Sequence, residues 1–208
     1  MSKSNQENSG KKFPLRLVLI VGGVLGVIGL LLYLSSPKSS VKSSATSGIP
    51  SLDSLVGNPA PSMQLTDKDG KAYSPDNLRG KNIILFFNEG IMCYPACWNQ
   101  VAALGADPKL NTEDTVAFSV VVDRPEQWQQ AMTKMPGLSK ATLLFDQGAT
   151  VSRELGLLAL PSSMHKGSIP GHTYIVLDKE GVVRYVYDDP NMANNNAKLI
   201  QKIAELNK

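Results

Sequence analysis

The chain has 208 residues, of which 42% are hydrophobic, and its formal net charge is +3. This length suits one ordinary globular domain with a tail, and the hydrophobic content is normal for a packed protein. The lysines and arginines of the folded region are not gathered into a stripe that would neutralise phosphates. Composition therefore predicts one core and excludes nucleic acid as an expected partner.

An uncharged apolar segment lies near the amino terminus. Residues 17–34 read LVLIVGGVLGVIGLLLYL, about the length that crosses a bilayer as a helix. A cleaved signal peptide is the alternative, but its apolar region is usually shorter, and no small-x-small cleavage site follows this segment directly. A buried core helix would show a polar face, which this segment lacks. We therefore predict an uncleaved transmembrane anchor.

The charges around this segment predict its orientation. Basic residues are more numerous before the span than just after it: Lys3, Lys11, Lys12 and Arg16 precede it, and Lys38 and Lys42 follow. The positive-inside rule then places residues 1–16 in the cytoplasm. Residues 35–51 are rich in Ser, which is typical of a flexible linker. We expect a single-pass protein of the cell membrane whose domain, residues 52–208, lies outside the cytoplasm.

The domain alternates short apolar runs with helical patterns. In chain order the sequence predicts a strand at 62–65, a turn or short helix at 77–81, a strand at 82–87, a helix after the cysteines, a strand at 115–122, a helix at 126–135, a strand at 141–146, a helix at 149–157, a hairpin of 173–178 with 182–187, and a helix at 196–206. The runs at 82–87 and 115–122 are continuously apolar, which indicates strands buried on both faces. This order predicts an α/β fold with a central mixed sheet flanked by helices.

Cys93 and Cys97 are the only cysteines. They lie where the central strand gives way to a helix, because Trp98, Val101 and Leu104 follow at helical spacing. A helix amino terminus stabilises a thiolate, which is the nucleophile of thiol chemistry. A spacing of four also brings two cysteines within about 6 Å, close enough for a disulfide. We therefore expect reversible formation of an intramolecular disulfide.

Two simpler interpretations compete with redox function. A structural disulfide is reasonable in an exported protein, but so small a loop removes little entropy from the unfolded chain. Two buried free thiols are common in cytosolic proteins and less expected in an exported loop. Position and spacing therefore favour redox chemistry.

Several motifs in order resemble the redoxin group of the thioredoxin superfamily. They are Gly57-Asn58-Pro59-Ala60-Pro61, Gly80-Lys81 before an apolar strand, a cysteine after that strand, and Leu177-Asp178-Lys179-Glu180-Gly181. That group holds the alkyl hydroperoxide reductase and thiol-specific antioxidant peroxiredoxins and membrane-tethered disulfide reductases. The resemblance implies a thioredoxin-like fold over residues 52–208. It also implies a thiol-dependent oxidoreductase without a cofactor, which acts on a peroxide or a protein disulfide and is reduced by a thiol partner.

The resemblance also assigns roles to residues. Peroxiredoxins of this group carry Pro-x-x-x-Thr/Ser-x-x-Cys, and if Cys97 is that cysteine, Gly90 and Tyr94 stand in the places of Pro and Thr. His172 stands where the family has Arg before the late strand, which implies that it tunes the thiolate or orients the substrate. Disulfide oxidoreductases usually have Cys-x-x-Cys, one residue shorter than the spacing here. The predicted catalytic residues are thus Cys93, Cys97 and His172, with peroxide and protein disulfide both open as substrates.

Copper binding is the alternative to catalysis. Copper-delivering relatives of thioredoxin carry Cys-x-x-x-Cys and a distant His, and soft thiolates suit Cu(I). Here Trp98 follows the second cysteine, where those proteins have Pro. His165 and His172 are the available imidazoles, and Met92 and Met164 are soft neighbours.

Three further residues have simpler interpretations. Asp123, at a strand end, is a candidate for proton transfer, with a cap or turn role as the simpler reading. Trp98 is a candidate to line a substrate surface beside the cysteines, with core packing as the simpler reading. Pro170 lies two residues away from the late strand, so no cis bond is predicted there.

Overall fold

A computed structural model describes residues 51–208. The predicted anchor at 17–34 and the segment before it lie outside the described residues, as does all but the last residue of the predicted linker. Within residues 51–208 no helix combines the length and the apolar content needed to cross a membrane.

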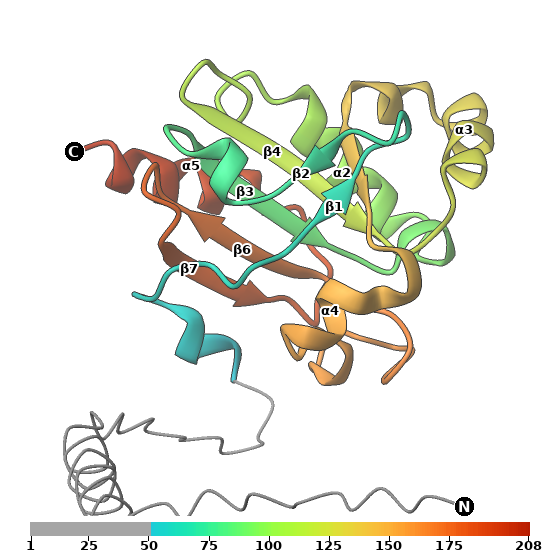
Figure 1. Ribbon diagram of the computed structural model, residues 1–208. Helices are drawn as coiled ribbons and strands as arrows, with labels where there is room; N and C mark the ends of the chain where they lie inside the picture. The colour runs from blue at the N-terminus through green and yellow to red at the C-terminus, as the bar shows by residue number, and fades with distance from the viewer. Residues whose placement is uncertain (1–50) are drawn as a thin grey trace, which may run out of the picture. The chain divides into compact units, whose positions relative to one another are not determined.

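The described chain forms a seven-stranded sheet with helices on both sides (Figure 1). The strands are β1 Leu65–Thr66, β2 Ala72–Tyr73, β3 Asn82–Phe87, β4 Thr115–Val121, β5 Thr142–Phe145, β6 Thr173–Leu177 and β7 Val183–Asp188. The helices are α2 Ala96–Ala106, α3 Pro125–Lys134, α4 Thr150–Glu154 and α5 Asn196–Leu206, with short 3-10 helices η1 Leu52–Leu55, η2 Asp76–Leu78, η3 Gly90–Met92, η4 Pro136–Lys140, η5 Gln147–Ala149 and η6 Leu157–Ala159.

The sheet is mixed, as predicted. Its order is β2-β1-β5-β4-β3-β6-β7. Strands β3, β4 and β5 run parallel, and β6 pairs antiparallel with both β3 and β7. In α/β proteins, ligand-binding and active sites lie at the edge of the sheet where the parallel strands have their carboxyl ends. The loop that carries both cysteines leaves β3 at this edge.

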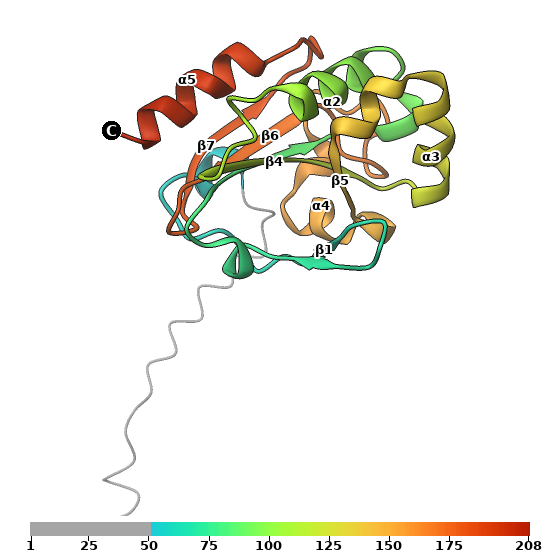
Figure 2. The same ribbon diagram turned by 90° about the horizontal axis from the view of Figure 1, so that it is seen from above.

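Two hydrophobic layers hold the helices against the sheet. Ile84 and Phe86 of β3 face the layer of α2, α3 and α5, whereas Ile83, Leu85 and Phe87 face the layer of η1 and α4. Figure 2 shows α2, α3 and α5 on one side of the sheet and α4 on the other. All of β3 is buried, which explains why its sequence has no polar alternation.

Helix α2 is fixed at both ends. Near its end, a Cβ on Gly105 would overlap the backbone of Ala141, so only glycine allows this close approach. Nearer its beginning, Gln100 accepts a hydrogen bond from Asn195 N at 2.7 Å and donates to Asn196 Oδ1 at 2.9 Å. These contacts hold the helix that begins at the cysteines to the start of α5.

Most predicted elements are confirmed within a few residues, and two are matched to the residue. Strand β3 and helix α5 have the predicted bounds, while the first strand was placed wrongly at 62–65 and begins at Leu65. It pairs with β2, which was not predicted. The side chain of Asp67 accepts hydrogen bonds from the backbone of Asp69 and Lys71, so this short hairpin is defined by its turn and carries little apolar pattern.

Candidate active site

Cys93 and Cys97 form a disulfide, with their Cα atoms 5.3 Å apart. This confirms the predicted close approach of the pair. Cys93 follows η3 directly, and Cys97 lies in the first turn of α2, where its backbone N donates to Cys93 O at 2.9 Å. Cys93 is 4% exposed and Cys97 is 0% exposed. Cys93 is therefore the slightly more accessible of the two.

The loop before the cysteines is held by a carboxylate below it. Asp123 accepts hydrogen bonds from Ile91 N at 3.1 Å and from Trp128 Nε1 at 3.0 Å. Gly90 has φ of 65°, and a Cβ there would overlap the Asp123 carboxylate. Both its backbone conformation and the lack of space therefore require glycine at this position. Burial is the largest influence on Asp123 and raises its pKa. These contacts fit the simpler interpretation of Asp123 as a loop support.

His172 lies beside the disulfide and is fully buried. Its Nδ1 is 3.8 Å from Cys97 Sγ, and its Nε2 is 3.1 Å from Ala193 O and 2.9 Å from the Tyr174 hydroxyl. A carbonyl oxygen only accepts hydrogen bonds, so the network assigns the ring hydrogen to Nε2. Burial lowers the pKa of His172, more than the nearby carboxylates raise it. The ring is thus neutral, with the bare Nδ1 facing the sulfur.

This arrangement suits proton transfer once the disulfide is reduced. The Cys97 thiol then faces a bare ring nitrogen that can take its proton. The resulting imidazolium keeps its hydrogen bond to Ala193 O, and the thiolate lies next to a positive charge. The structure thus brings together all three predicted catalytic residues, Cys93, Cys97 and His172.

A buried carboxylate organises the loop that supports the histidine. Asp189 accepts hydrogen bonds from Asn195 Nδ2 at 2.8 Å, Ala193 N at 3.0 Å and Asn191 N at 3.1 Å. Burial by itself raises the pKa of Asp189, but these hydrogen-bond donors bring that pKa below its usual value. Asp189 therefore remains charged and fixes the peptide of Ala193, whose oxygen orients the imidazole.

The same loop covers the other cysteine. Met192 Sδ is 3.7 Å from Cys93 Sγ, and Met192 has φ of 50°, a left-handed conformation uncommon for methionine. Sequence reasoning missed Met192, which is 99 residues from Cys93 in a segment without a recognisable motif. The methionines named from sequence, Met92 and Met164, are instead 64% and 65% exposed.

His165 has a different role from His172. Its Nδ1 is 3.4 Å from Glu89 Oε1, which also accepts hydrogen bonds from Met164 N at 2.6 Å and His165 N at 3.3 Å. Glu89, only 1% exposed, thus fastens the turn at 164–165 to the loop after β3. Sequence reasoning missed Glu89, because a carboxylate in a predicted loop is ordinarily solvated. The described residues contain no group of three or more His, Cys, Asp or Glu that could hold a metal ion.

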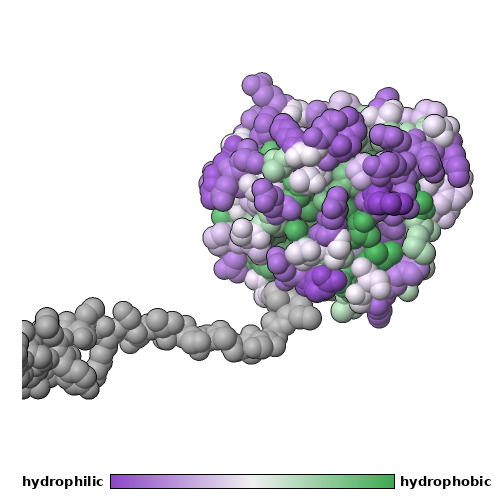
Figure 3. Space-filling view, turned by 45° about the vertical axis from the view of Figure 1, so that its right-hand side comes forward, coloured by the Kyte–Doolittle hydropathy of each residue, from purple (hydrophilic) through white to green (hydrophobic). Residues whose placement is uncertain are grey.

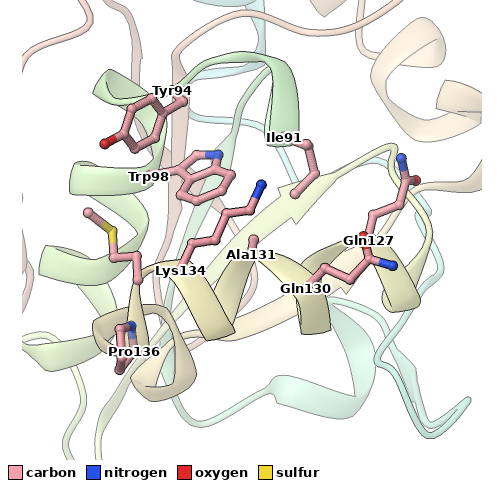
Figure 4. Close-up of a pocket in the computed structure, with 9 residues that line it drawn as sticks. Ile91, Tyr94, Trp98, Gln127, Gln130, Ala131, Lys134 and Pro136 are labelled. Carbon is pink, nitrogen blue, oxygen red and sulfur yellow. The ribbon is translucent and has the colours of Figure 1, made fainter.

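The aromatic residues beside the cysteines form a surface. Trp98 is 5% exposed and packs in the core, as predicted, with its ring 6.2 Å from that of Trp128. Tyr94, between the cysteines, is 67% exposed and meets Trp98 edge-on, with the ring centroids 5.1 Å apart. Both rings line a pocket between the start of α2 and α3 (Figure 4).

Comparison with known proteins identifies similar sequences. Residues 55–200 match the family described as Redoxin. Peroxiredoxin Q, chloroplastic, from Triticum aestivum is 32% identical over 149 residues, which cover 64% of this chain and 58% of that protein. Its counterpart from Gentiana triflora is 30% identical over 166 residues, covering 78% and 73%. A putative peroxiredoxin bcp from Haemophilus influenzae is 23% identical, covering 73% and 97%. The chain thus spans less than two thirds of the wheat protein's length.

Solved structures share the fold at lower identity. A peroxiredoxin-like protein from Aquifex aeolicus has a TM-score of 0.59 at 21% identity and covers 73% of this chain and 86% of its own. The yeast mitochondrial 1-Cys peroxiredoxin has a TM-score of 0.61 at 16% identity, covering 73% and 76%. A putative protein disulfide isomerase from Bacteroides thetaiotaomicron has a TM-score of 0.53 at 23% identity, covering 73% and 89%. These likenesses confirm the predicted thioredoxin-like α/β fold.

Proposed function

This chain belongs to the Redoxin family, and from that premise we propose that it is a peroxiredoxin-like thiol oxidoreductase that cycles Cys93 and Cys97 between dithiol and disulfide. The observation that carries the proposal is the disulfide between its only two cysteines, with the bare Nδ1 of His172 3.8 Å from Cys97 Sγ. A structural disulfide across so few residues would stabilise the fold only weakly. A base at one of the sulfurs supports turnover instead.

The reductive half of the cycle begins at the more exposed sulfur. A partner thiolate attacks Cys93 Sγ, forms a mixed disulfide with it and releases Cys97 as a thiolate. A second partner thiolate then attacks the partner sulfur of the mixed disulfide and releases Cys93. The partner leaves as a disulfide, two electrons have entered the protein, and Cys97 can share a proton with His172.

The oxidative half runs through the same two sulfurs. With a peroxide, Cys93 thiolate takes one oxygen to become a sulfenic acid, and the alcohol or water leaves. With a protein disulfide, Cys93 thiolate forms a mixed disulfide and releases one protein thiolate. In either case His172 accepts the Cys97 proton, and the Cys97 thiolate attacks Cys93 Sγ. This attack restores the disulfide and releases water or the second protein thiol.

One experiment separates the two substrates. The reduced full-length protein is mixed with hydrogen peroxide and, separately, with an oxidised protein disulfide, and the second-order rate constants are compared. The matched control replaces both cysteines by serine. We expect at least one oxidant to convert the parent to the Cys93–Cys97 disulfide. Equal rates for the parent and the control with both oxidants would refute the proposal.

We also propose that the protein is tethered to the cell membrane by residues 17–34, with the Redoxin domain outside the cytoplasm. The uncharged span and the excess of basic residues before it support this orientation. Protease added to intact spheroplasts should digest the domain. Digestion only after lysis would contradict the proposed orientation.

Copper binding is a second candidate, favoured by the donors around the reduced sulfurs. Met192 Sδ lies 3.7 Å from Cys93 Sγ and His172 Nδ1 lies 3.8 Å from Cys97 Sγ, and such soft and imidazole donors suit Cu(I). Titration of the reduced protein with Cu(I) tests this candidate. Tight binding that is lost in His172→Ala, without thiol turnover in the parent, would replace the enzyme proposal.

A further inference from the structure

A pocket of about 640 Å³ lies between the start of α2 and the face of α3 (Figure 4), and two of its lining residues, Tyr94 and Trp98, directly follow the two cysteines in the chain. Apolar and aromatic side chains predominate in its walls, with polar groups from α3: the lining residues are Ile91, Tyr94, Trp98, Ala131, Met135, Pro136, Gln127, Gln130 and Lys134. Its volume is within the range of pockets that hold small ligands or several side chains.

The pocket adjoins the reacting sulfurs in the chain itself. Tyr94 directly follows Cys93, and Trp98 directly follows Cys97. The Trp98 Nε1 is buried without a hydrogen-bond partner among the described residues. An occupant of this pocket therefore contacts the side chains that follow the two cysteines in the chain.

Exposed hydrophobic side chains lie close to the disulfide in the chain. Within the described residues the exposed large hydrophobic side chains are Val56, Met92, Tyr94 and Met164. Met92 and Tyr94 flank Cys93, and Met164 belongs to the turn that Glu89 fastens to the cysteine loop. Figure 3 shows one face of the described domain, on which hydrophobic areas lie between hydrophilic side chains. Exposed apolar side chains gathered at one place mark contact with another macromolecule, whereas a small peroxide needs no such surface.

The polar groups of the pocket indicate the chemistry of its occupant. Gln127, Gln130 and Lys134 lie on one face of α3 at helical spacing. Gln130 can donate to and accept from a peptide backbone, and Gln127, whose Oε1 accepts from Arg124 N at 3.0 Å, can donate to one. Among the described residues that line the pocket, Lys134 alone carries a charge. It makes no ion pair within residues 51–208. The pocket therefore favours an apolar segment with a carboxylate.

We propose that this pocket docks the polypeptide of the thiol partner: an apolar side chain next to the partner's reactive cysteine enters the pocket, and an acidic residue beyond it pairs with Lys134. The inference rests on the proposed thiol exchange and specifies its partner as a protein with an acidic, apolar segment at its cysteine. Docking then holds the partner sulfur at Cys93, so recognition and attack take place at neighbouring residues.

Synthetic cysteine peptides test this inference on the oxidised full-length protein. One peptide has Leu and Glu after its cysteine, a second has Leu and Lys, and a third has Ser and Glu. The second-order rate of reduction of the Cys93–Cys97 disulfide is measured for each peptide. Each rate is divided by the same peptide's rate with oxidised glutathione, which corrects for intrinsic thiol reactivity.

A charge swap gives the sharpest readout. We expect the Leu-Glu peptide to react about 1.5- to fivefold faster than the Leu-Lys peptide, the range of an exposed ion pair, and faster than the Ser-Glu peptide. Lys134→Glu should reverse the preference between the two charged peptides, whereas the matched variant Lys109→Glu, at an exposed position outside the pocket, should retain it. Dithiothreitol should reduce all three proteins at the same rate.

Failure of docking and failure of the redox proposal give different results. If the peptide order is the same in Lys134→Glu as in the parent, or if Leu and Ser peptides react equally, the docking inference is wrong while thiol exchange stands. If neither dithiothreitol nor any peptide reduces the disulfide, the proposed function itself is wrong.

Discussion

Replacing His172 by Gln tests whether the imidazole sets the acidity of Cys97. With a separation of 3.8 Å between Nδ1 and Sγ, an imidazolium and a thiolate attract each other by about 4 kcal/mol at an effective dielectric constant of about 20. This energy corresponds to about 3 pKa units. Burial raises the pKa of the thiol in both proteins, so it does not change the difference between them. We therefore expect the pKa of Cys97 to be clearly higher in His172→Gln than in the parent.

Glutamine suits this test because it retains part of the network. Its amide can donate to Ala193 O, as the ring Nε2 does, but it offers no base to the sulfur. An alanine would leave Ala193 O and the Tyr174 hydroxyl with fewer hydrogen-bond partners. Each group left unsatisfied would lower the free energy of unfolding by about 1 to 3 kcal/mol. The free energy of unfolding by urea, measured for both proteins, shows whether the fold is retained.

The assay follows the thiolate directly. In a Cys93→Ser background only Cys97 titrates as a thiol, and its ultraviolet absorbance is recorded against pH, with the double Cys→Ser variant subtracted. The reasoning fails if the pKa of Cys97 in the parent background and in His172→Gln agree within about half a unit.

The oxidised protein gives an independent readout of the same histidine. Burial holds the pKa of His172 below its usual 6.5, so below pH 6.5 the unfolded chain binds a proton that the folded chain does not. Stability from the neutral ring is therefore present above pH 6.5 and is lost as the pH falls toward the folded pKa. His172→Gln should remove this contribution, and its stability should fall less steeply with acid. Equal slopes in both proteins would contradict a buried neutral histidine.

Three other predictions concern the groups around the disulfide. Asp189→Asn should slow turnover and lower the free energy of unfolding by about 1 to 3 kcal/mol, because an amide satisfies fewer of the donors that the carboxylate accepts; unchanged urea unfolding would contradict it. Gly90→Ala should lower the free energy of unfolding by about 3 kcal/mol or more, because the added Cβ overlaps the Asp123 carboxylate and the residue has a positive φ. Gly137→Ala, whose added Cβ meets only ordinary contacts, should lower it much less. Met192→Ala should speed reduction of the disulfide by dithiothreitol severalfold, because it uncovers Cys93. Met164→Ala, at an exposed position, should leave the rate unchanged. Equal rates for Met192→Ala and the parent would show that the Met192 thioether does not protect Cys93.

The parts of this protein that could be predicted from sequence are those with local signals. The uniformly apolar run of β3 marks a strand buried on both faces, and the periodic apolar positions of α5 mark its helix. The spacing of Cys93 and Cys97 sufficed to predict their approach, because both lie at one strand-to-helix junction. His172 was found only through its place in a family pattern.

The remainder of the site depends on contacts between distant segments. Met192 meets Cys93 across 99 residues, and Glu89 binds a turn 75 residues away. No periodicity or motif marks such pairs, because the fold alone brings them together. Asp189 was missed for a related reason: in sequence it is one carboxylate in a polar loop, and only its burial and its donors show that it organises the site.

The surroundings of the two sulfurs differ in a way that gives the cycle a direction. Cys93 retains slight exposure and contacts a thioether, which neither donates nor accepts a proton, whereas Cys97 is sealed from solvent beside a base. In the proposed cycle, exchange with other molecules takes place at Cys93 and proton transfer takes place at Cys97. One loop supports both sulfurs, because Met192 contacts Cys93 and Ala193 O orients His172, while Asp189 fixes Ala193. A displacement of this loop would expose the first sulfur and loosen the base of the second, so access and acidity change together.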